Sequence, residues 1–409
     1  MIGTERRAGS DLGDRPVGLR TRRRQLEAQR RQKIAASIAG GVAFSSVLVA
    51  ALVWLWSGGM VGRGPDQAAG SRTESTLLLA YAPSGIDQPA ASLVLFGLVG
   101  DADASALLIP SGTTTDIPVH GPAGLGESVS FGGPQLLALA TENLLGVRVD
   151  GVAVLDAQGF AQAAANLEPF ELFLDDRVGV RQGDAIVTKF QAGKLRLDGS
   201  SLAEFLAIRG EGESEIAAVA RQQKAWEAVL ERSRETGRSM LVESVETSHI
   251  ASNLPLSALQ EFLEKLDRRR VAFSLLPVDP KQSLEGVETF EPRIQEIQRL
   301  IVQHFPGAAI APDLESRIRV GILNGNGGVG VTEEAARLLI PGGYRVVYTE
   351  NADNFEYNET LIVFYRTPDE RVARDIQSRL GRGKLVFNTE IQDVVDILIV
   401  LGKDFPGSG

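Results

Sequence analysis

The sequence contains no cysteine and only three histidines. The lack of cysteine excludes disulfide bonds, thiolate metal sites and cysteine nucleophiles. His120, His249 and His304 are too far apart in the sequence to form a helical zinc motif, so we identify no metal site. The Gly-x-Ser-x-Gly pattern of many serine hydrolases is also absent. These absences argue against the common metal-dependent and covalent hydrolases.

Charge is distributed unevenly along the chain. Residues 1–33 contain ten Lys or Arg against four Asp or Glu, whereas the whole chain of 409 residues has a net charge of −10. The rest of the chain is therefore strongly acidic, which argues against nucleic acid as a partner. The basic residues instead predict a tail that stays in the cytoplasm beside a membrane.

An apolar stretch runs from Ile34 to Trp56 and contains no charged residue. Crossing the hydrocarbon core of a bilayer takes about 20 such residues, and Trp54 and Trp56 are typical of the membrane interface. A cleaved signal peptide is the alternative, but its apolar region is usually only about 7–15 residues long. We therefore expect a single N-terminal transmembrane helix at 34–56. The chain would then be a single-pass cell-membrane protein with a cytoplasmic N-terminus and an extracytoplasmic bulk.

Two folded domains are expected beyond this segment. Residues 57–74 have the composition of a flexible linker. From 75 to 305, short apolar runs are mixed with segments of helical spacing such as Glu291–Phe305, which predicts an α/β (α+β) domain with a mixed sheet and flanking helices. A second linker at 306–316 leads to residues 317–405. There the pattern predicts a small α/β domain with the order β-α-β-β-α-β-β.

Polar residues lie around a glycine-containing break between two predicted helices. Asp198 is expected to cap the first helix, and the second is expected from about Ser214 to Glu235. An arginine pair beside such a break can bind a pyrophosphate through bidentate, charge-assisted hydrogen bonds. The alternative is that these arginines form ordinary surface ion pairs. The candidate ligand-binding residues are Arg209, Arg221, Gln222 and Gln223.

The last domain contains a glycine-rich turn with the spacing of a dinucleotide fingerprint. Asn324 is followed by Gly325, Gly327 and Gly330, and Glu350 stands twenty positions after the last glycine. Only about ninety residues belong to this domain, whereas a dinucleotide site spans two halves of a larger sheet. We therefore expect these glycines to supply positive φ angles and a close backbone approach at a tight turn.

The whole arrangement resembles the LytR-CpsA-Psr family with its LytR C-terminal domain. The resemblance rests on the segments Leu108–Pro110, Leu197–Gly199, Arg221–Gln223 and, most specifically, Val320–Gly330 with the sequence VGILNGNGGVG. It implies a membrane-anchored protein that transfers lipid-linked anionic glycopolymers to peptidoglycan outside the cytoplasm.

This sequence departs from the family pattern at the positions where the family has charged site residues. Where the family has Arg-Asp after the proline, this sequence has Ser111 and Gly112. The second arginine of the family's Arg-x-Arg pair survives as Arg209. The remaining family positions for arginine, aspartate and the magnesium-binding aspartate are occupied by Ala207, Glu215, Ala218 and Ala91.

This combination predicts a protein that kept the family's scaffold and lost its catalytic motif. Our first hypothesis is a non-catalytic binder or scaffold for lipid-linked glycopolymer, peptidoglycan or other envelope proteins, without a cofactor. The first alternative is an active phosphotransferase that uses Arg209, Arg221 and Mg²⁺ held by a displaced ligand such as Asp101 or Glu215. The second alternative is a transmembrane regulator that acts through its basic tail. The apolar helices of the central domain could also enclose a groove for a polyprenyl chain.

Overall fold

The computed structural model describes residues 72–282, 288–311, 313–390 and 393–406. The predicted basic tail and transmembrane segment lie outside these residues, as does nearly all of the first linker. Over the described part of the chain, no helix combines the length and the apolar character needed to cross a bilayer.

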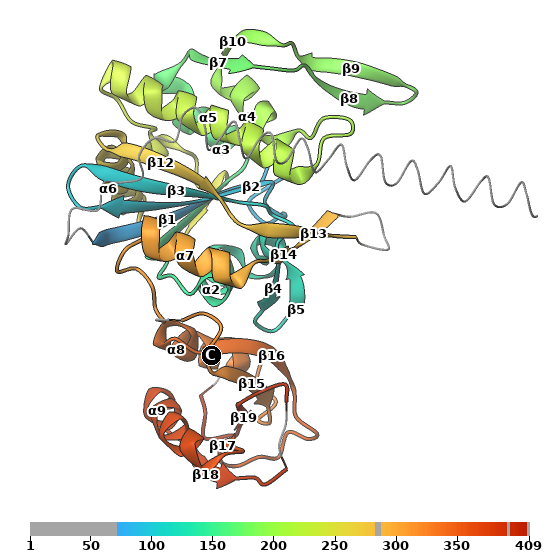
Figure 1. Cartoon of the computed structure of the whole chain (residues 1–409), viewed down its shortest axis with the longest axis vertical. Coiled ribbons are helices and arrows are strands. Elements are labelled where there is room, and N and C mark those ends of the chain that lie inside the picture. Colours follow the sequence, from blue (N-terminus) through green and yellow to red (C-terminus); the bar gives the residue numbers. More distant parts are fainter. Residues whose placement is uncertain (1–71, 283–287, 312, 391–392, 407–409) are drawn as a thin grey trace, which may run out of the picture. The chain divides into compact units, whose positions relative to one another are not determined.

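A six-stranded sheet forms the centre of the first domain (Figure 1). Its strands are β1 (Thr73–Tyr81), β2 (Ser92–Val99), β3 (Asp103–Ile109), β6 (Gly151–Leu155), β11 (Ile250–Ser252) and β12 (Arg270–Leu275). They lie in the order β11-β6-β1-β2-β3-β12. The β1–β2, β2–β3 and β6–β11 pairs are antiparallel, whereas the β1–β6 and β3–β12 pairs are parallel. The prediction of a mixed sheet is therefore confirmed.

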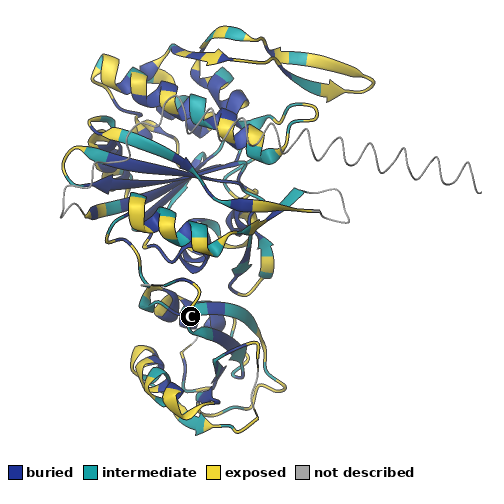
Figure 2. Cartoon of the chain, viewed as in Figure 1, coloured by how far each residue is buried: buried dark blue, intermediate teal, exposed yellow. Residues whose placement is uncertain are grey.

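The central strands of this sheet are buried on both faces (Figure 2). Strand β2 is buried at every position, because after Ser92 its residues are apolar instead of alternating with polar ones. Leu77 and Leu79 of β1 belong to one hydrophobic core, and Leu78 and Ala80 belong to the other. The first core is covered by α3 (Ala157–Ala164), α4 (Gly199–Ala207), α5 (Glu215–Thr236) and α6 (Leu256–Asp267). The second core is covered by α2 (Ser128–Leu145) and α7 (Ile294–His304).

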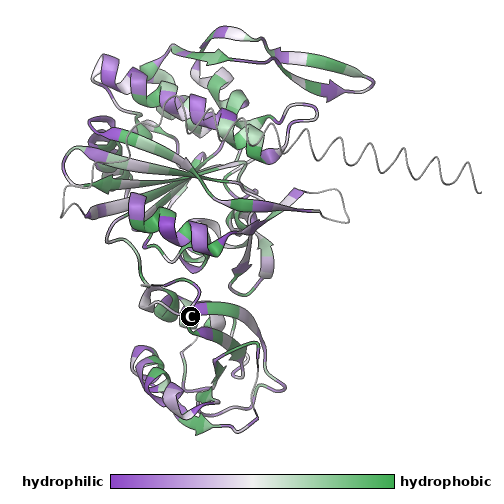
Figure 3. Ribbon diagram, viewed as in Figure 1, coloured by the Kyte–Doolittle hydropathy of each residue, from purple (hydrophilic) through white to green (hydrophobic). Residues whose placement is uncertain are grey.

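Helices α4 and α5 begin where the sequence predicts. The Asp198 carboxylate accepts a hydrogen bond from the Ser201 N–H, and the Ser214 hydroxyl accepts one from the Ala217 N–H. These bonds satisfy backbone donors that have no partner within the first helical turn. Figure 3 shows hydrophilic and hydrophobic residues alternating along α5, whereas the central strands are mainly hydrophobic.

The helix predicted at Glu291–Phe305 was wrong at its start. The segment up to Pro292 forms β14 (Glu288–Pro292), which pairs with β13 (Val278–Gln282), and α7 begins only at Ile294. Phe290, which is 1% exposed, anchors this hairpin in the second core. Three further antiparallel strand pairs were not predicted: β4 (Thr114–Ile117) with β5 (Gly121–Gly124), β7 (Phe170–Leu174) with β10 (Gly193–Leu197), and β8 (Val178–Gln182) with β9 (Ala185–Phe190).

The C-terminal domain has its own sheet and core, as predicted. Its elements are β15 (Arg319–Asn324), α8 (Val331–Leu339), β16 (Arg345–Asn351), β17 (Leu361–Phe364), α9 (Glu370–Leu380), β18 (Lys384–Phe387) and β19 (Ile397–Leu401). The five strands lie in the order β16-β15-β19-β17-β18. Only the β17–β19 pair is antiparallel. The predicted order β-α-β-β-α-β-β is confirmed.

Candidate functional site

The structure brings several of the altered ionic positions together at the end of β3. The Glu215 carboxylate, at the start of α5, accepts hydrogen bonds from the Gly112 N–H at 2.9 Å and from the Ser111 hydroxyl at 3.2 Å. Its two partners come from the loop after β3, more than a hundred residues earlier in the chain. A carboxylate therefore contacts the loop at which the resembled family carries an arginine.

A second glutamate, Glu288 at the start of β14, completes this cluster. Its Oε2 accepts a hydrogen bond from the Glu215 N–H at 2.9 Å and forms an ion pair with Arg209 Nη2 at 2.6 Å. Arg209 Nε also donates to the Glu213 carbonyl oxygen at 2.6 Å. The arginine that survives from the Arg-x-Arg pair is thus bound by the protein itself.

Arg221 is buried and lies between α4 and α5. Its side chain is 7% exposed, and its Nε and Nη2 groups donate to the two oxygens of the Glu213 carboxylate at 2.9 and 3.0 Å. The same guanidinium donates to the carbonyl oxygens of Phe205 and Ile208 at 2.7 and 2.6 Å. All three nitrogens are therefore engaged within the protein, and this geometry favours a structural role for Arg221 over ligand binding.

The two predicted glutamines have different surroundings. Gln222 is buried and donates from Nε2 to the carbonyl oxygens of Ala91 and Leu206, so it joins α5 to the segment before β2. Its Oε1 has no hydrogen-bond partner within the described part of the chain. Gln223 instead donates to Glu227 on the outer side of α5. The structure therefore places Gln222, but not Gln223, beside the cluster.

The cluster has more acidic than basic groups. Arg209 and Arg221 are surrounded by Glu213, Glu215 and Glu288, which leaves a formal charge of −1. A pyrophosphate would have to compete with these carboxylates for both guanidinium groups. Within the described ranges, no group of three His, Asp or Glu residues could hold a metal ion.

Glu213 and Glu288 were not among the predicted site residues. Glu213 lies in the glycine-containing break, but its contact with Arg221 depends on how α4 and α5 pack. Glu288 belongs to the β13–β14 hairpin, for which we found no sequence signal. The hairpin also crowds Gly112, because a Cβ atom at that position would lie 2.7 Å from the Glu288 carbonyl oxygen. An aspartate at position 112, as in the resembled family, would therefore require β14 to shift.

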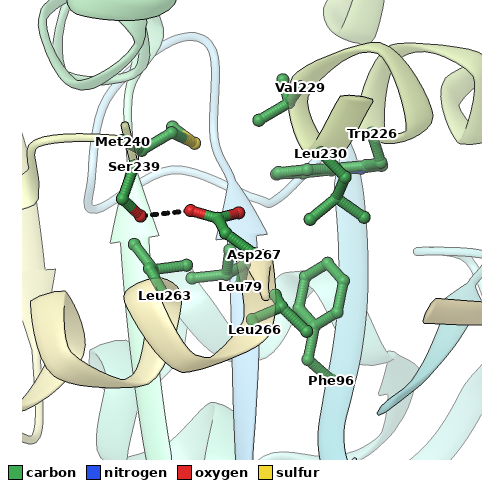
Figure 4. Close-up of a pocket in the computed structure, with 10 residues that line it drawn as sticks. All are labelled: Leu79, Phe96, Trp226, Val229, Leu230, Ser239, Met240, Leu263, Leu266 and Asp267. Carbon is green, nitrogen blue, oxygen red and sulfur yellow. Dashed lines mark hydrogen bonds between the residues drawn. The ribbon is translucent and has the colours of Figure 1, made fainter. Parts of the chain in front are cut away.

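An apolar pocket lies between the sheet and helices α5 and α6 (Figure 4). Its volume of about 10 Å³ has room for about one water molecule. Trp226, Leu230 and Leu266 are among the side chains that fill it, and the Asp267 carboxylate accepts a hydrogen bond from Ser239 at its edge. A polyprenyl chain would enter this region only if these side chains moved.

In the glycine-rich turn of the C-terminal domain, backbone N–H groups donate hydrogen bonds to a side chain of the turn itself. The Asn324 side-chain oxygen accepts hydrogen bonds from the N–H groups of Asn326 and Gly327, at 3.2 and 2.9 Å. Gly327 and Gly330 have φ angles of +77° and +76°, as the sequence predicts. Because the loop's own side chains occupy these N–H groups, they are not available to cradle a phosphate. The geometry favours the structural explanation of the glycine motif.

Replacing Gly325 with alanine is expected to lower the free energy of unfolding by at least about 1 kcal/mol. A Cβ atom there would lie 2.8 Å from Tyr357 Cδ2 and 2.9 Å from the Leu401 carbonyl oxygen, so the turn or the end of β19 would have to shift. Urea denaturation measures the loss. The control is Val329→Ala in the same turn, because Val329 is 92% exposed and should change stability by less than about 0.5 kcal/mol. Equal stabilities of the two variants would contradict the close-approach explanation.

Comparison with known families gives two matches. The model described as the LytR_cpsA_psr family matches residues 99–304, just over half of the chain. The model described as LytR cell envelope-related transcriptional attenuator matches residues 317–405.

Similar proteins are distant in sequence. The regulatory protein MsrR of Staphylococcus aureus is 25% identical over 233 residues, which are 55% of this chain and 65% of MsrR. The match therefore spans less than two thirds of the length of that relative. Among solved structures, B. subtilis TagV has 15% identity and a TM-score of 0.46 over 56% of this chain and 96% of its own. B. subtilis TagT has 20% identity and a TM-score of 0.43 over 57% of this chain and 89% of its own.

Proposed function

This chain belongs to the LytR-CpsA-Psr family of cell-envelope proteins, and from that premise we propose that it acts by binding and not by catalysis. Its ligand would be a lipid-linked glycopolymer, peptidoglycan or another envelope protein. The C-terminal domain would serve as a second interaction module.

One observation carries this proposal: the cationic groups of the candidate site are neutralised from within. Glu288 binds Arg209, Glu213 binds Arg221, and Glu215 binds the loop at Ser111 and Gly112. Phosphoryl transfer depends mainly on positioning and on neutralisation of developing charge by arginines and metal ions. Losing one such group commonly costs about 10²–10³-fold in rate. A site that lacks several of them and adds carboxylates should transfer phosphoryl groups very slowly.

We further propose that the chain is anchored in the cell membrane by residues 34–56, with its N-terminus in the cytoplasm. The charge-free run of these residues supports an anchor, and the excess of basic residues before it supports this orientation. Both domains would then act outside the cytoplasm, where the family's glycopolymer and peptidoglycan partners are found.

Native mass spectrometry of the full-length protein tests the absence of catalysis. The protein is mixed with a medium-chain polyprenyl pyrophosphate and Mg²⁺, so that one spectrum reports both bound and cleaved ligand. We expect no conversion of the pyrophosphate to the monophosphate. An adduct of intact ligand would support lipid binding, and the absence of any adduct would direct the search to protein or peptidoglycan partners. Conversion to monophosphate would contradict the proposal.

Two variants test whether the carboxylates block the site. Glu288→Gln removes the charge that binds Arg209 and is expected to strengthen the pyrophosphate adduct. Glu291→Gln lies on the same strand but faces Asp279 of β13, and it is the matched control. Equal adduct levels for the two variants would show that Glu288 does not limit anion binding.

A further inference from the structure

A second pocket lies at the contact between the first domain and the C-terminal domain. Its volume is about 30 Å³, which has room for about two or three water molecules. The polar residues that line it are Thr114 and Thr115 of β4, Asn143 of α2, Arg317, and Arg345 of β16. It lies near the end of β14 opposite Glu288, because Pro292 is also part of its wall.

Arg317 is a buried cation without a carboxylate ion pair among the described residues. It is 6% exposed, and it donates to the carbonyl oxygens of Asn143, Tyr344 and Gly343 at 2.7, 2.5 and 3.2 Å. A guanidinium has five N–H donors, so two remain available after these three bonds. Burial lowers the pKa of Arg317 to about 10, and the nearby charge of Arg345 lowers it as well. The side chain therefore remains charged at neutral pH, in a place where protein carbonyls supply only partial compensation.

Arg345 adds a second guanidinium to the same pocket. Among the described residues, the Arg345 side chain pairs only with Asp116, whose Oδ2 accepts a hydrogen bond from Nη2 at 3.2 Å, and it is 42% exposed. The carboxylate that acts on Arg317 is that of Glu142, and its Oε1 already accepts a hydrogen bond from the Val149 N–H. Most of the N–H groups of Arg345 are thus free to bind a ligand.

The remaining polar wall is rigid and offers hydroxyl groups. Asn143 donates to the carbonyl oxygens of Asp116 and Val346 and accepts from the Val346 N–H, so its amide is fully used in holding α2 against β4 and β16. Thr115 is 7% exposed, and both threonines line the pocket. Hydroxyl donors beside two guanidinium groups are suited to an oxyanion with several acceptor oxygens.

We propose that this pocket binds a small oxyanion of the phosphate class, held by Arg317, Arg345 and a threonine hydroxyl of β4. The anion is either free phosphate or one phosphate group of a polymer that carries phosphate esters. Because the two arginines belong to the C-terminal domain and the threonines to the first domain, the bound anion also strengthens the contact between the domains. The proposal uses none of the residues of the Ser111–Glu215 cluster and does not depend on the proposed function.

Isothermal titration of the full-length protein with inorganic phosphate tests this proposal, with chloride at matched ionic strength as the reference. We expect saturable binding with about one phosphate per chain and a phosphate-dependent rise in Tm. Arg345→Gln should weaken binding at least about tenfold, because it removes hydrogen bonds between charged groups. Arg345→Lys should restore part of the affinity, since it returns the charge without the planar fork. The control is Arg374→Gln on α9, where an exposed arginine pairs with Glu370 far from the pocket residues in sequence.

Thr114→Val and Thr115→Val provide independent variants if Arg345→Gln does not fold. Their side chains lie on opposite faces of β4, so we expect one of the two variants to weaken binding as well. Titration with glycerophosphoglycerol, a phosphodiester, distinguishes the two sources of the anion. Binding of phosphate alone would assign the pocket to the free ion, and binding of both would assign it to a polymer phosphate. The proposal is overturned if millimolar phosphate shows no saturable binding, or if the pocket variants bind it as tightly as Arg374→Gln.

Discussion

Replacing Arg221 with methionine is expected to lower the free energy of unfolding by about 3–5 kcal/mol, the usual result of removing one partner from a buried ion pair. Methionine fills much of the space of the arginine stem but donates no hydrogen bond. It would leave the Glu213 carboxylate, which is 17% exposed, without its cation. It would also leave the carbonyl oxygens of Phe205 and Ile208 without the donors that they have now. The connection between α4 and α5 should therefore be weakened.

The matched control for this prediction is Arg374→Met on α9. Arg374 pairs with Glu370 at the surface, where the two side chains are 64% and 42% exposed. An exposed pair of this kind contributes about 0.5 kcal/mol or less. Both variants are compared with the original chain by urea denaturation. If Arg221→Met proves as mild as the control, Arg221 is not needed for the fold, and its assignment as a ligand-binding residue becomes the better explanation.

Stability is expected to fall by about 3 kcal/mol as the pH rises from about 4 to about 7, through the titration of Asp267 alone. Burial in the pocket of Figure 4 raises the pKa of Asp267 from 3.8 to about 6, while hydrogen bonds, including that from Ser239, oppose the rise. Below pH 3.8 the carboxyl group is protonated in both the folded and the unfolded chain. Between these two pKa values only the unfolded chain releases the proton, so unfolding becomes more favourable. The difference between 3.8 and about 6 corresponds to about 3 kcal/mol.

Asp267→Asn isolates this contribution, because the amide oxygen can still accept the hydrogen bond from Ser239 and cannot ionise. The variant should be more stable than the original chain at pH 7 and lose this advantage as the pH approaches 4. Burial also raises the pKa of Asp116 and Glu142, so the informative quantity is the difference between the two proteins at each pH. Asp184→Asn at the exposed β8–β9 turn is the control and should show no such trend. Parallel pH profiles for Asp267→Asn and the original chain would contradict the assignment.

These two predictions concern the same half of the first domain and bear on its function. Arg221 lies near the start of α5 and Asp267 at the end of α6, and both helices cover the first core. If Arg221 is a structural residue, then Arg209 is the only arginine of the candidate site that could be released for a ligand. That result would support a binding role and argue against phosphoryl transfer.

The order of elements could be predicted from the sequence because the signals are local. Asp198 and Ser214 cap helices through bonds to residues only three positions away. The buried strands are short apolar runs, and Gly327 and Gly330 stand where the turn needs a positive φ angle. A mixed sheet domain followed by a smaller α/β domain follows from these patterns.

Local patterns gave a wrong prediction where the spacing of apolar residues fits both a helix and a strand followed by a helix. The segment before Ile294 has spacing compatible with a helix, but Phe290 is buried in the second core and β14 pairs with β13. The surroundings of Arg221 were missed for a related reason: a polar residue within a helix is expected at the surface unless a partner from another element accompanies it into the core.

The sequence by itself predicted the order of the domains and the main strands and helices. It also carries other residues at positions where the family resemblance leads us to expect arginines and aspartates. Only the tertiary structure decided what replaced them. Glu215 lies 104 positions from Ser111 and 73 from Glu288, and these groups meet because the sheet and the β13–β14 hairpin bring the three segments to one edge. Contacts between residues so far apart produce no periodic pattern in the sequence, since they depend on how the finished helices and strands pack. The same reason explains the pocket at Arg317 and Arg345, whose threonines come from a different domain.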